Sequence, residues 1–318
     1  MTSNEHTKLS LGIVGLGKMG SHLAMQAAEK GMHVVAHSKH RHPDMESKGV
    51  LTEADYVALA AALKKPRVIY LSVPAGQTVD EVLDSLVPCL AKGDVVMDGG
   101  NSFYLDSVER EKAVAKDGIY FLDCGTSGGV EGARNGACFM VGGKKEGFLI
   151  AEPVLKALAV EGGLLYTGPP GSGHYVKLVH NGIEFVMNHG IGDGVELLLH
   201  GDYDLDVEAI FENWSHGSVI RGWLVELMAR GLREKRFSDI PTYTEDTGEV
   251  NWLVELAADK EISIPFIALA VMELFESRGS GLDRARAVAL LRHEYGGHPF
   301  GKDEHIAEER KTSRLTKL

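Results

Sequence analysis

The chain has 318 residues, a formal net charge of −12 at pH 7, 44% hydrophobic residues and 25% charged residues. This length allows two domains with a sizeable core, and the composition is ordinary for a soluble globular protein. The negative charge argues against generic nucleic-acid binding, which usually requires a basic patch.

The cysteines and the apolar runs indicate the cellular compartment in which the protein is expected. Cys89, Cys124 and Cys138 lie far apart and form no C-x-x-C pair, so they indicate neither a zinc site nor a disulfide framework. No run of 18 apolar residues is present in the sequence, and residues 1–10 lack the apolar core of a signal peptide. We therefore expect a cytoplasmic protein with no membrane partner and no metal.

Short apolar runs alternate with helical patterns along the first half of the chain. The alternation predicts parallel βαβ units, and thus an α/β Rossmann-like, doubly wound sheet over residues 1–173. The strand-like runs cover residues 9–17, 33–38, 67–76, 94–100, 119–125, 138–143 and 164–168, with helical patterns at 21–31 and 78–93.

The pattern changes after a breaker-rich joint at residues 169–173. Strand-like runs nearly vanish, and the sequence predicts an all-α C-terminal domain over residues 174–318. The expected helices cover residues 174–200, 206–232, 250–259, 264–278 and 283–294.

A glycine motif ends the first predicted strand and opens a helix. Gly15, Gly17 and Gly20 have G-x-G-x-x-G spacing, which allows a tight turn, close approach of a pyrophosphate and close helix–strand packing. This context favours a dinucleotide site over a glycine turn without a ligand. The cofactor set predicted around it also includes Leu16, Lys18, Met19, Val73 and Pro74.

The end of the second predicted strand bears on the choice between NAD and NADP. NAD enzymes commonly place Asp or Glu there, but this sequence reads AHSKHRH and has no carboxylate before Asp44. Ser38, Lys39 and Arg41 would instead face a 2′-phosphate. We therefore expect NADP, with NAD as the alternative if this segment is only a basic surface loop.

Two loops at successive strand ends carry polar groups. Asn101, in DGGNS (98–102), is suited to a polyol or to the nicotinamide amide, and we assign it to both the substrate and cofactor sets. Ser127, Gly128 and Gly129 offer backbone N–H groups suited to a carboxylate. Either loop alone is compatible with an ordinary loop, but two together favour a ligand crevice.

The segment YVKLVHNGIEF (175–185) predicts a helix with one polar stripe. At about 100° per residue, Lys177, His180, Asn181, Glu184 and Asn188 share that stripe. The apolar Val179, Ile183 and Val186 point the other way and would normally be the buried side. A solvated face is one interpretation. Two features favour a catalytic interpretation. The stripe follows the domain joint, where clefts form, and it carries both a base, Lys177, and an acid, Glu184.

Five motifs together resemble the 6-phosphogluconate dehydrogenase family of decarboxylating oxidoreductases. They are GLGKMG, DGGNS, SGGVEGA, GHYVKLVHNGIEF and RHEYGGH. The resemblance covers roughly residues 9–300, and the length matches the short-chain branch, whose helical domain is present once. KLVHNGIE is the most specific motif, whereas many dehydrogenases share the glycine motif.

The resemblance implies catalytic roles for the stripe. Lys177 would take the 3-hydroxyl proton as hydride leaves carbon 3, and it would then stabilise the enolate formed when carbon dioxide is lost. Glu184 would protonate carbon 1 of the enediol, giving a ketopentose phosphate. Asn181 and His180 would hold the substrate hydroxyls.

The resemblance also assigns the anionic groups of a sugar-acid substrate. Ser127, Gly128 and Gly129 would hold the carboxylate. Arg292 and His298 would hold the distal anion, and in the family they can reach the site of a neighbouring subunit. We therefore expect a homodimer, or a homotetramer made of dimers.

The match departs from the family at the distal anion pocket. Phe185 replaces a tyrosine, and Asn251 and Leu253 replace a basic residue and a threonine beside a tryptophan. Glu276 stands where an arginine is expected, with Arg278 two places on. The expected substrate is 6-phosphogluconate, or a related gluconate with another group at carbon 6, such as a sulfonate, or with none.

Two other functions remain open. A non-decarboxylating β-hydroxyacid dehydrogenase would share the glycine motif and the pair Lys177 and Asn181, but it would not need Glu184. A cofactor-binding regulator without activity would need none of the three.

Overall fold

The computed structural model describes residues 8–40, 42–296 and 299–303. It divides into two compact units. We call Met1–Glu184 together with Gly248–Ile262 the N-terminal unit, and Phe185–Thr247 together with Ser263–Leu318 the C-terminal unit. Helix α8 (Ser172–His200) begins in the first unit and ends in the second.

The N-terminal unit contains an eight-stranded sheet with the order β3-β2-β1-β4-β5-β6-β7-β8. Neighbouring strands are parallel from β3 to β6, β7 is antiparallel to β6, and β8 is parallel to β7. The strands are β1 (Ser10–Val14), β2 (His33–His37), β3 (Val50–Glu53), β4 (Val68–Leu71), β5 (Val95–Asp98), β6 (Tyr120–Ser127), β7 (Ala137–Gly143) and β8 (Ala159–Gly168).

The antiparallel pair of β6 and β7 is an exception to the parallel βαβ units that the sequence predicts. Only residues 128–136 separate β6 from β7. A parallel crossover needs a dozen or more residues, so the chain returns along the neighbouring strand in the opposite direction. The doubly wound α/β architecture itself is confirmed.

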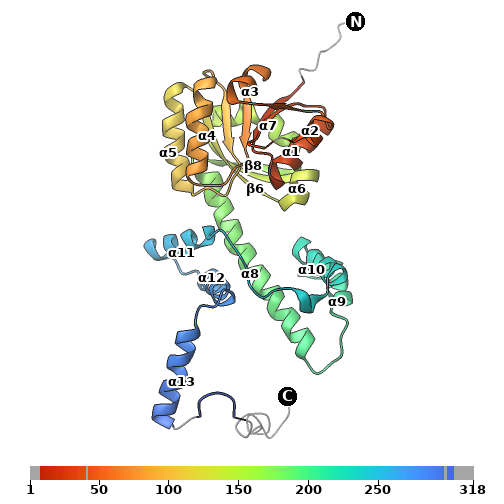
Figure 1. Cartoon of the computed structure of the whole chain (residues 1–318), viewed down its shortest axis with the longest axis vertical. Coiled ribbons are helices and arrows are strands. Elements are labelled where there is room, and N and C mark those ends of the chain that lie inside the picture. The colour runs from red at the N-terminus through yellow and green to blue at the C-terminus, as the bar shows by residue number, and fades with distance from the viewer. Residues whose placement is uncertain (1–7, 41, 297–298, 304–318) are drawn as a thin grey trace. The chain divides into compact units, whose positions relative to one another are not determined.

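Helices cover both faces of the sheet (Figure 1). One face packs its buried side chains against α1 and α7, and the other against α3 and α4. Alternate residues of β1 supply the two cores, because successive strand side chains point to opposite faces. The helices of this part are α1 (Lys18–Glu29), α2 (Pro43–Glu46), α3 (Tyr56–Ala62), α4 (Gln77–Leu86), α5 (Tyr104–Val114), α6 (Gly129–Asn135) and α7 (Lys145–Leu158), with short 3₁₀ turns at Val87–Cys89 and Ala115–Asp117.

The regular elements described after β8 are all helices, as predicted. The expected helix over 206–232 is two helices, because a turn with Gly217 at φ +74° lies between them. The elements are α8, α9 (Val207–Ser215), α10 (Trp223–Glu234), a 3₁₀ turn (Phe237–Asp239), α11 (Glu249–Asp259), α12 (Pro265–Ser277) and α13 (Leu282–Gly296). No helix in the described part of the chain is long and apolar enough to span a membrane.

Candidate active site

The first turns of α8 lie directly on the sheet because glycines remove the side chains between them. A Cβ added to Gly142 would lie 2.6 Å from the backbone nitrogen of Gly173. A Cβ added to Gly125 on β6 would lie 2.5 Å from Cβ of Lys177. Contacts this short are not available to real side chains, so only glycine permits this approach.

This close approach buries two residues of the polar stripe, Lys177 and Asn181. Lys177 and Asn181 are only 7% and 6% exposed, whereas the side chain of Ile183 is 53% exposed. The expectation that Ile183 belongs to the buried side is therefore wrong for this part of α8. The glycine surface of β6 and β7 selects which face of the helix packs, and it selects the face that carries Lys177.

The burial of Lys177 alters its acid–base properties. Removal from water lowers the pKa of Lys177 from its usual value, while the carboxylates of Glu184 and Glu249 act in the opposite direction. The lowering prevails. A lysine can act as a base only when it is neutral, and a lowered pKa increases its neutral fraction near pH 7.

A small cavity adjoins Lys177 in the N-terminal unit. Asn101 and Asn181 each direct their side-chain amide at Oε1 of Glu249, with N···O distances of 3.5 Å. The cavity is lined by Asn101, Ser102, His174, Lys177, Leu178, Asn181, Glu249 and Trp252. The DGGNS loop after β5 and the polar stripe of α8 therefore meet at this cavity.

Sequence reasoning missed Glu249 and Trp252. In the segment EVNWL (249–253), the sequence pointed only to Asn251 and Leu253, which are not among the cavity-lining residues, and Leu253 is buried. The ring of Trp252 lies 5.0 Å from that of Phe103, next to the DGGNS loop. The only sequence signal for these two residues is an acid and an aromatic residue at the start of one helix, and this signal by itself is weak evidence for a site.

His180 connects the loop after β6 to the stripe. Its Nε2 lies 3.1 Å from Ser127 Oγ, and its Nδ1 lies 3.1 Å from Asn181 Oδ1. An amide oxygen only accepts, so Nδ1 carries the hydrogen and Nε2 accepts from the Ser127 hydroxyl. The carboxylate of Glu184 lies 4.0 Å from the same ring. This chain of contacts orients Asn181 toward Glu249.

The loop after β6 continues into α6 through two glycines. Gly128 and Gly129 have φ values of +112° and +58°, a region that glycine occupies without steric cost. Ser127 is half-buried and Gly129 is exposed. The three residues predicted to hold a carboxylate thus lie together next to His180.

The glycine motif has the geometry of a dinucleotide cradle. Gly15 has φ +96°, and its N–H donates to the carbonyl of His37 at 2.8 Å. A Cβ on Gly20 would lie 2.9 Å from Cβ of Ser72, whereas a Cβ on Gly17 would meet nothing within 4 Å. The turn is therefore closed on the strand side and open where a pyrophosphate would approach α1.

The other predicted cofactor residues surround this turn. Val73 lies against Gly15, and Pro74 follows it, exposed, in the loop before α4. Leu16 belongs to the core, so only its backbone is available to a ligand. Lys18 is exposed and Met19 half-buried at the start of α1.

The basic segment after β2 is described only in part. Ser38 Oγ lies 3.3 Å from His42 Nε2, and Lys39 is exposed. Arg41 lies outside the described residues.

The predicted distal anion residues belong to the sequence range of the C-terminal unit. Arg292 is an exposed residue of α13, and His298 lies outside the described residues. Glu276 pairs with Arg284, and Arg278 pairs with Asp246 at 3.0 Å. Among the described residues, no group of three or more His, Cys, Asp or Glu side chains is arranged to hold a metal ion.

Comparisons with known proteins agree with this geometry. Residues 10–168 match the family described as the NAD binding domain of 6-phosphogluconate dehydrogenase, and residues 173–313 match the 6-phosphogluconate dehydrogenase C-terminal domain. The NAD(+)-dependent, decarboxylating 6-phosphogluconate dehydrogenase of Haloferax volcanii is 37% identical over 93% of this chain and 100% of its own length. The Bacillus licheniformis enzyme is 40% identical over 71% of this chain, which spans only 51% of that enzyme.

Solved structures give the same result. The 6-phosphogluconate dehydrogenase of Plasmodium falciparum, described with NADP+ and with 6-phosphogluconate, has a TM-score of 0.75 and 28% identity over 92% of this chain and 66% of its own. A 3-hydroxyisobutyrate dehydrogenase of Salmonella typhimurium has a TM-score of 0.70 at 20% identity, covering 86% of this chain and 95% of its own, which shows a shared fold. The chain belongs to the 6-phosphogluconate dehydrogenase family of nicotinamide-dependent oxidoreductases.

Proposed function

We propose that this protein oxidises a gluconate-type sugar acid at carbon 3 and releases its carboxylate as carbon dioxide. The observation that carries the proposal is the buried Lys177 with a lowered pKa, beside Asn181, Glu184 and the loop of Asn101. A solvated helix face would not place a lysine at 7% exposure next to two amides that share a carboxylate.

Each residue of the site then has a chemical task. Neutral Lys177 removes the proton of the 3-hydroxyl, and the nicotinamide ring, when bound, accepts the hydride from carbon 3. The resulting β-keto acid loses carbon dioxide because the new carbonyl takes up the electrons. Protonated Lys177 stabilises the enolate oxygen. Glu184 delivers a proton to carbon 1 of the enediol, which was carbon 2 of the sugar acid, and this gives a ketopentose product.

Substrate binding falls to the neighbouring loops. Ser127 and the backbone of Gly128 and Gly129 hold the carboxylate until it leaves. His180 and Asn181 hold hydroxyls, and their mutual hydrogen bond leaves His180 Nε2 as an acceptor and the side-chain NH₂ of Asn181 as a donor. Asn101, in the loop after β5, lines the same cavity, which supports its assignment to both the cofactor and the substrate.

We propose NADP as the preferred cofactor, with NAD as the alternative. The support is the absence of a carboxylate from the first residues after β2, together with Ser38 and Lys39 in that segment. Ser38→Asp should shift the preference toward NAD, because a carboxylate repels a 2′-phosphate and accepts hydrogen bonds from ribose. Ratios of kcat/KM for the two cofactors test this, and a wild-type ratio in favour of NAD would contradict it.

The site also bears on which group the substrate carries at carbon 6. Phe185, Asn251 and Leu253 replace groups that would donate to a phosphate, and each lost charge-assisted bond costs about 1.5–3 kcal/mol. Two such losses weaken binding by roughly two to four decades. We propose 6-phosphogluconate as the default substrate, in an enzyme that tolerates or prefers gluconate without a phosphate or with a 6-sulfonate.

Relative kcat/KM values for 6-phosphogluconate, gluconate and a 6-sulfonated gluconate test this proposal. A preference for the phosphate compound above about 10⁴ would mean that other residues bind the phosphate well. A smaller ratio supports the tolerant pocket.

A second candidate is a β-hydroxyacid dehydrogenase that does not decarboxylate, because the Salmonella typhimurium structure shares the fold. Product analysis separates the two, since only the first releases carbon dioxide. A regulator without activity is disfavoured by the Lys177, Asn181 and Glu184 set. Turnover of any sugar acid would exclude it.

We also propose that residues 174–318 mediate assembly into a homodimer or a tetramer of dimers. The C-terminal unit exposes large apolar side chains along α12 and α13, a pattern expected of interfaces. Phe266 is 73%, Leu269 58% and Leu291 62% exposed. A monodisperse monomer in light scattering at micromolar concentration would contradict the proposal.

A further inference from the structure

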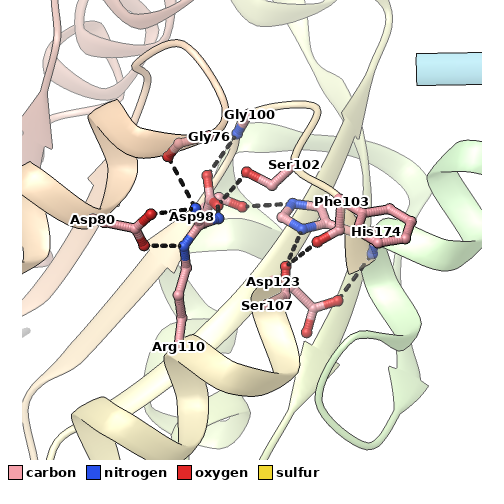
Figure 2. A network of polar contacts seen from close by, with 10 residues as sticks. All are labelled: Gly76, Asp80, Asp98, Gly100, Ser102, Phe103, Ser107, Arg110, Asp123 and His174. Atoms are coloured by element: carbon pink, nitrogen blue, oxygen red, sulfur yellow. Dashed lines mark hydrogen bonds and ion pairs between the residues drawn. The ribbon is translucent and has the colours of Figure 1, made fainter. Parts of the chain in front are cut away.

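A buried polar network connects β5, β6, α5 and the start of α8 (Figure 2), and two of its residues also line the cavity. We call it the His174 network. The whole network belongs to the N-terminal unit, and all its members are buried. Its members are Asp98, Ser102, Ser107, Arg110, Asp123 and His174.

The imidazole of His174 joins two elements. Its Nε2 lies 3.1 Å from the backbone oxygen of Asp98, and its Nδ1 lies 2.7 Å from Ser107 Oγ. A carbonyl only accepts, so Nε2 carries the ring hydrogen. Nδ1 then accepts from the Ser107 hydroxyl, whose other neighbour, the carbonyl of Phe103, is farther away at 3.3 Å. The ring is thereby tied to the end of β5 and to α5.

The backbone of His174 has a separate anchor. Its N–H donates to Asp123 Oδ2 at 2.9 Å, and the N–H of Gly171 donates to Oδ1 of the same carboxylate at 2.8 Å. Asp123 on β6 therefore caps the start of α8. This cap does not involve the imidazole, so loss of the ring leaves the helix start held.

Asp98 holds the DGGNS loop through its carboxylate. Oδ2 accepts from Ser102 Oγ at 2.6 Å, and Oδ1 accepts from the Gly100 N–H at 3.1 Å. The Arg110 guanidinium lies 3.7 Å from this carboxylate and pairs with Asp80 at 2.6 Å. Asn101 lies between Gly100 and Ser102, so its position depends on that of Asp98.

We infer that His174 is a positioning residue that fixes the loop of Asn101 relative to Lys177. Lys177 follows His174 by one helical turn on α8, and both line the same cavity. The imidazole bonds the carbonyl of the same Asp98 whose carboxylate shapes the loop. This inference rests on the proposed function. It adds to the site a residue that takes part in neither hydride transfer nor proton transfer.

Three variants separate positioning from stability. His174→Leu removes both ring bonds. His174→Gln keeps an amide donor at the place of Nε2, so it should still reach the Asp98 carbonyl. Val154→Ala, a buried substitution on α7, lowers stability without touching the network.

Steady-state kinetics with the best sugar-acid substrate and NADPH binding by fluorescence are the measurements. His174→Leu should lower kcat by about 10²-fold, the effect of a misplacement near 1 Å, with NADPH affinity unchanged within about twofold. His174→Gln should recover most of the loss, and Val154→Ala should keep wild-type kcat. An unchanged kcat in His174→Leu, or no recovery in His174→Gln, would overturn the inference. So would a rise in KM alone.

Two further measurements keep the test decisive. If His174→Leu does not fold, Ser107→Ala removes only the bond to Nδ1 and should still lower kcat several-fold, whereas an unchanged value would overturn the inference. Crystal structures of the wild type, His174→Gln and His174→Leu provide a test that does not depend on activity. Residues 98–102 should change position relative to α8 only in His174→Leu. A wild type without turnover would refute the proposed function, while an unmoved loop would refute the positioning role.

Discussion

Replacing Gly125 on β6 by alanine tests how the sheet positions Lys177. The new methyl group would lie 2.5 Å from Cβ of Lys177, whereas carbon atoms make favourable contacts at about 3.5–4.0 Å. Helix α8 must therefore retreat by about 1–1.5 Å, or the strand must bend. Overpacking of this kind costs about 1–3 kcal/mol of folding free energy. A displacement of 1 Å at a catalytic group costs about 10²-fold in rate.

Thermal unfolding and steady-state kinetics measure the two effects separately. Gly125→Ala should lower Tm by about 2–4 °C per kcal/mol, and it should lower kcat about 10²-fold. Gly231→Ala on α10 is the matched control, because nothing lies within 4 Å of its Cβ position and alanine favours helix. That control should keep kcat and gain slightly in Tm.

The reasoning fails if Gly125→Ala behaves like Gly231→Ala. Wild-type kcat with an unchanged Tm would mean that the sheet accepts a side chain at Gly125. The close approach of α8 would then not be the cause of Lys177 burial.

Lys177→Met should abolish turnover while NADPH binding, measured by fluorescence, survives, because the glycine turn is untouched. Glu184→Gln should slow the overall reaction by roughly 10²–10⁴, the range for loss of one acid–base group, and near-wild-type rates in either variant would contradict their roles. Glu249→Gln removes a charge that raises the pKa of Lys177, so that pKa should fall further. The acidic limb of the pH profile of kcat/KM, where Lys177 must lose its proton, should then move to lower pH. Glu255→Gln, an exposed position on α11, should leave the limb in place.

Much of the fold could be predicted from local patterns. Buried strands such as β5 read as continuous apolar runs, and the glycine turn after β1 has a fixed spacing. Strand β3, with the sequence VLTE, was missed because it is short and half polar. The direction of β7 depends on connection length rather than on its own residues, so its apolar run could not reveal it.

Candidate site residues could be predicted where a reactive or polar side chain also follows a predicted strand or shares a helix face with another such side chain. Helical geometry places Lys177 and Asn181 on one stripe. Asn101 follows a strand of the predicted sheet, at the edge where ligands bind. The burial of the stripe was not predictable from α8 alone, because it depends on glycines such as Gly125 and Gly142 on other elements. Glu249 lies far along the chain, and only tertiary structure brings it to the cavity.

The most direct test of the central claim is the stoichiometry of carbon dioxide release. The purified protein is incubated with 6-phosphogluconate, gluconate or a 6-sulfonated gluconate labelled at carbon 1, with NADP and with NAD. Evolved labelled carbon dioxide is compared with reduced cofactor. We expect one carbon dioxide for each reduced cofactor with at least one substrate, and loss of both in Lys177→Met. Reduced cofactor without carbon dioxide would contradict it and indicate a non-decarboxylating dehydrogenase.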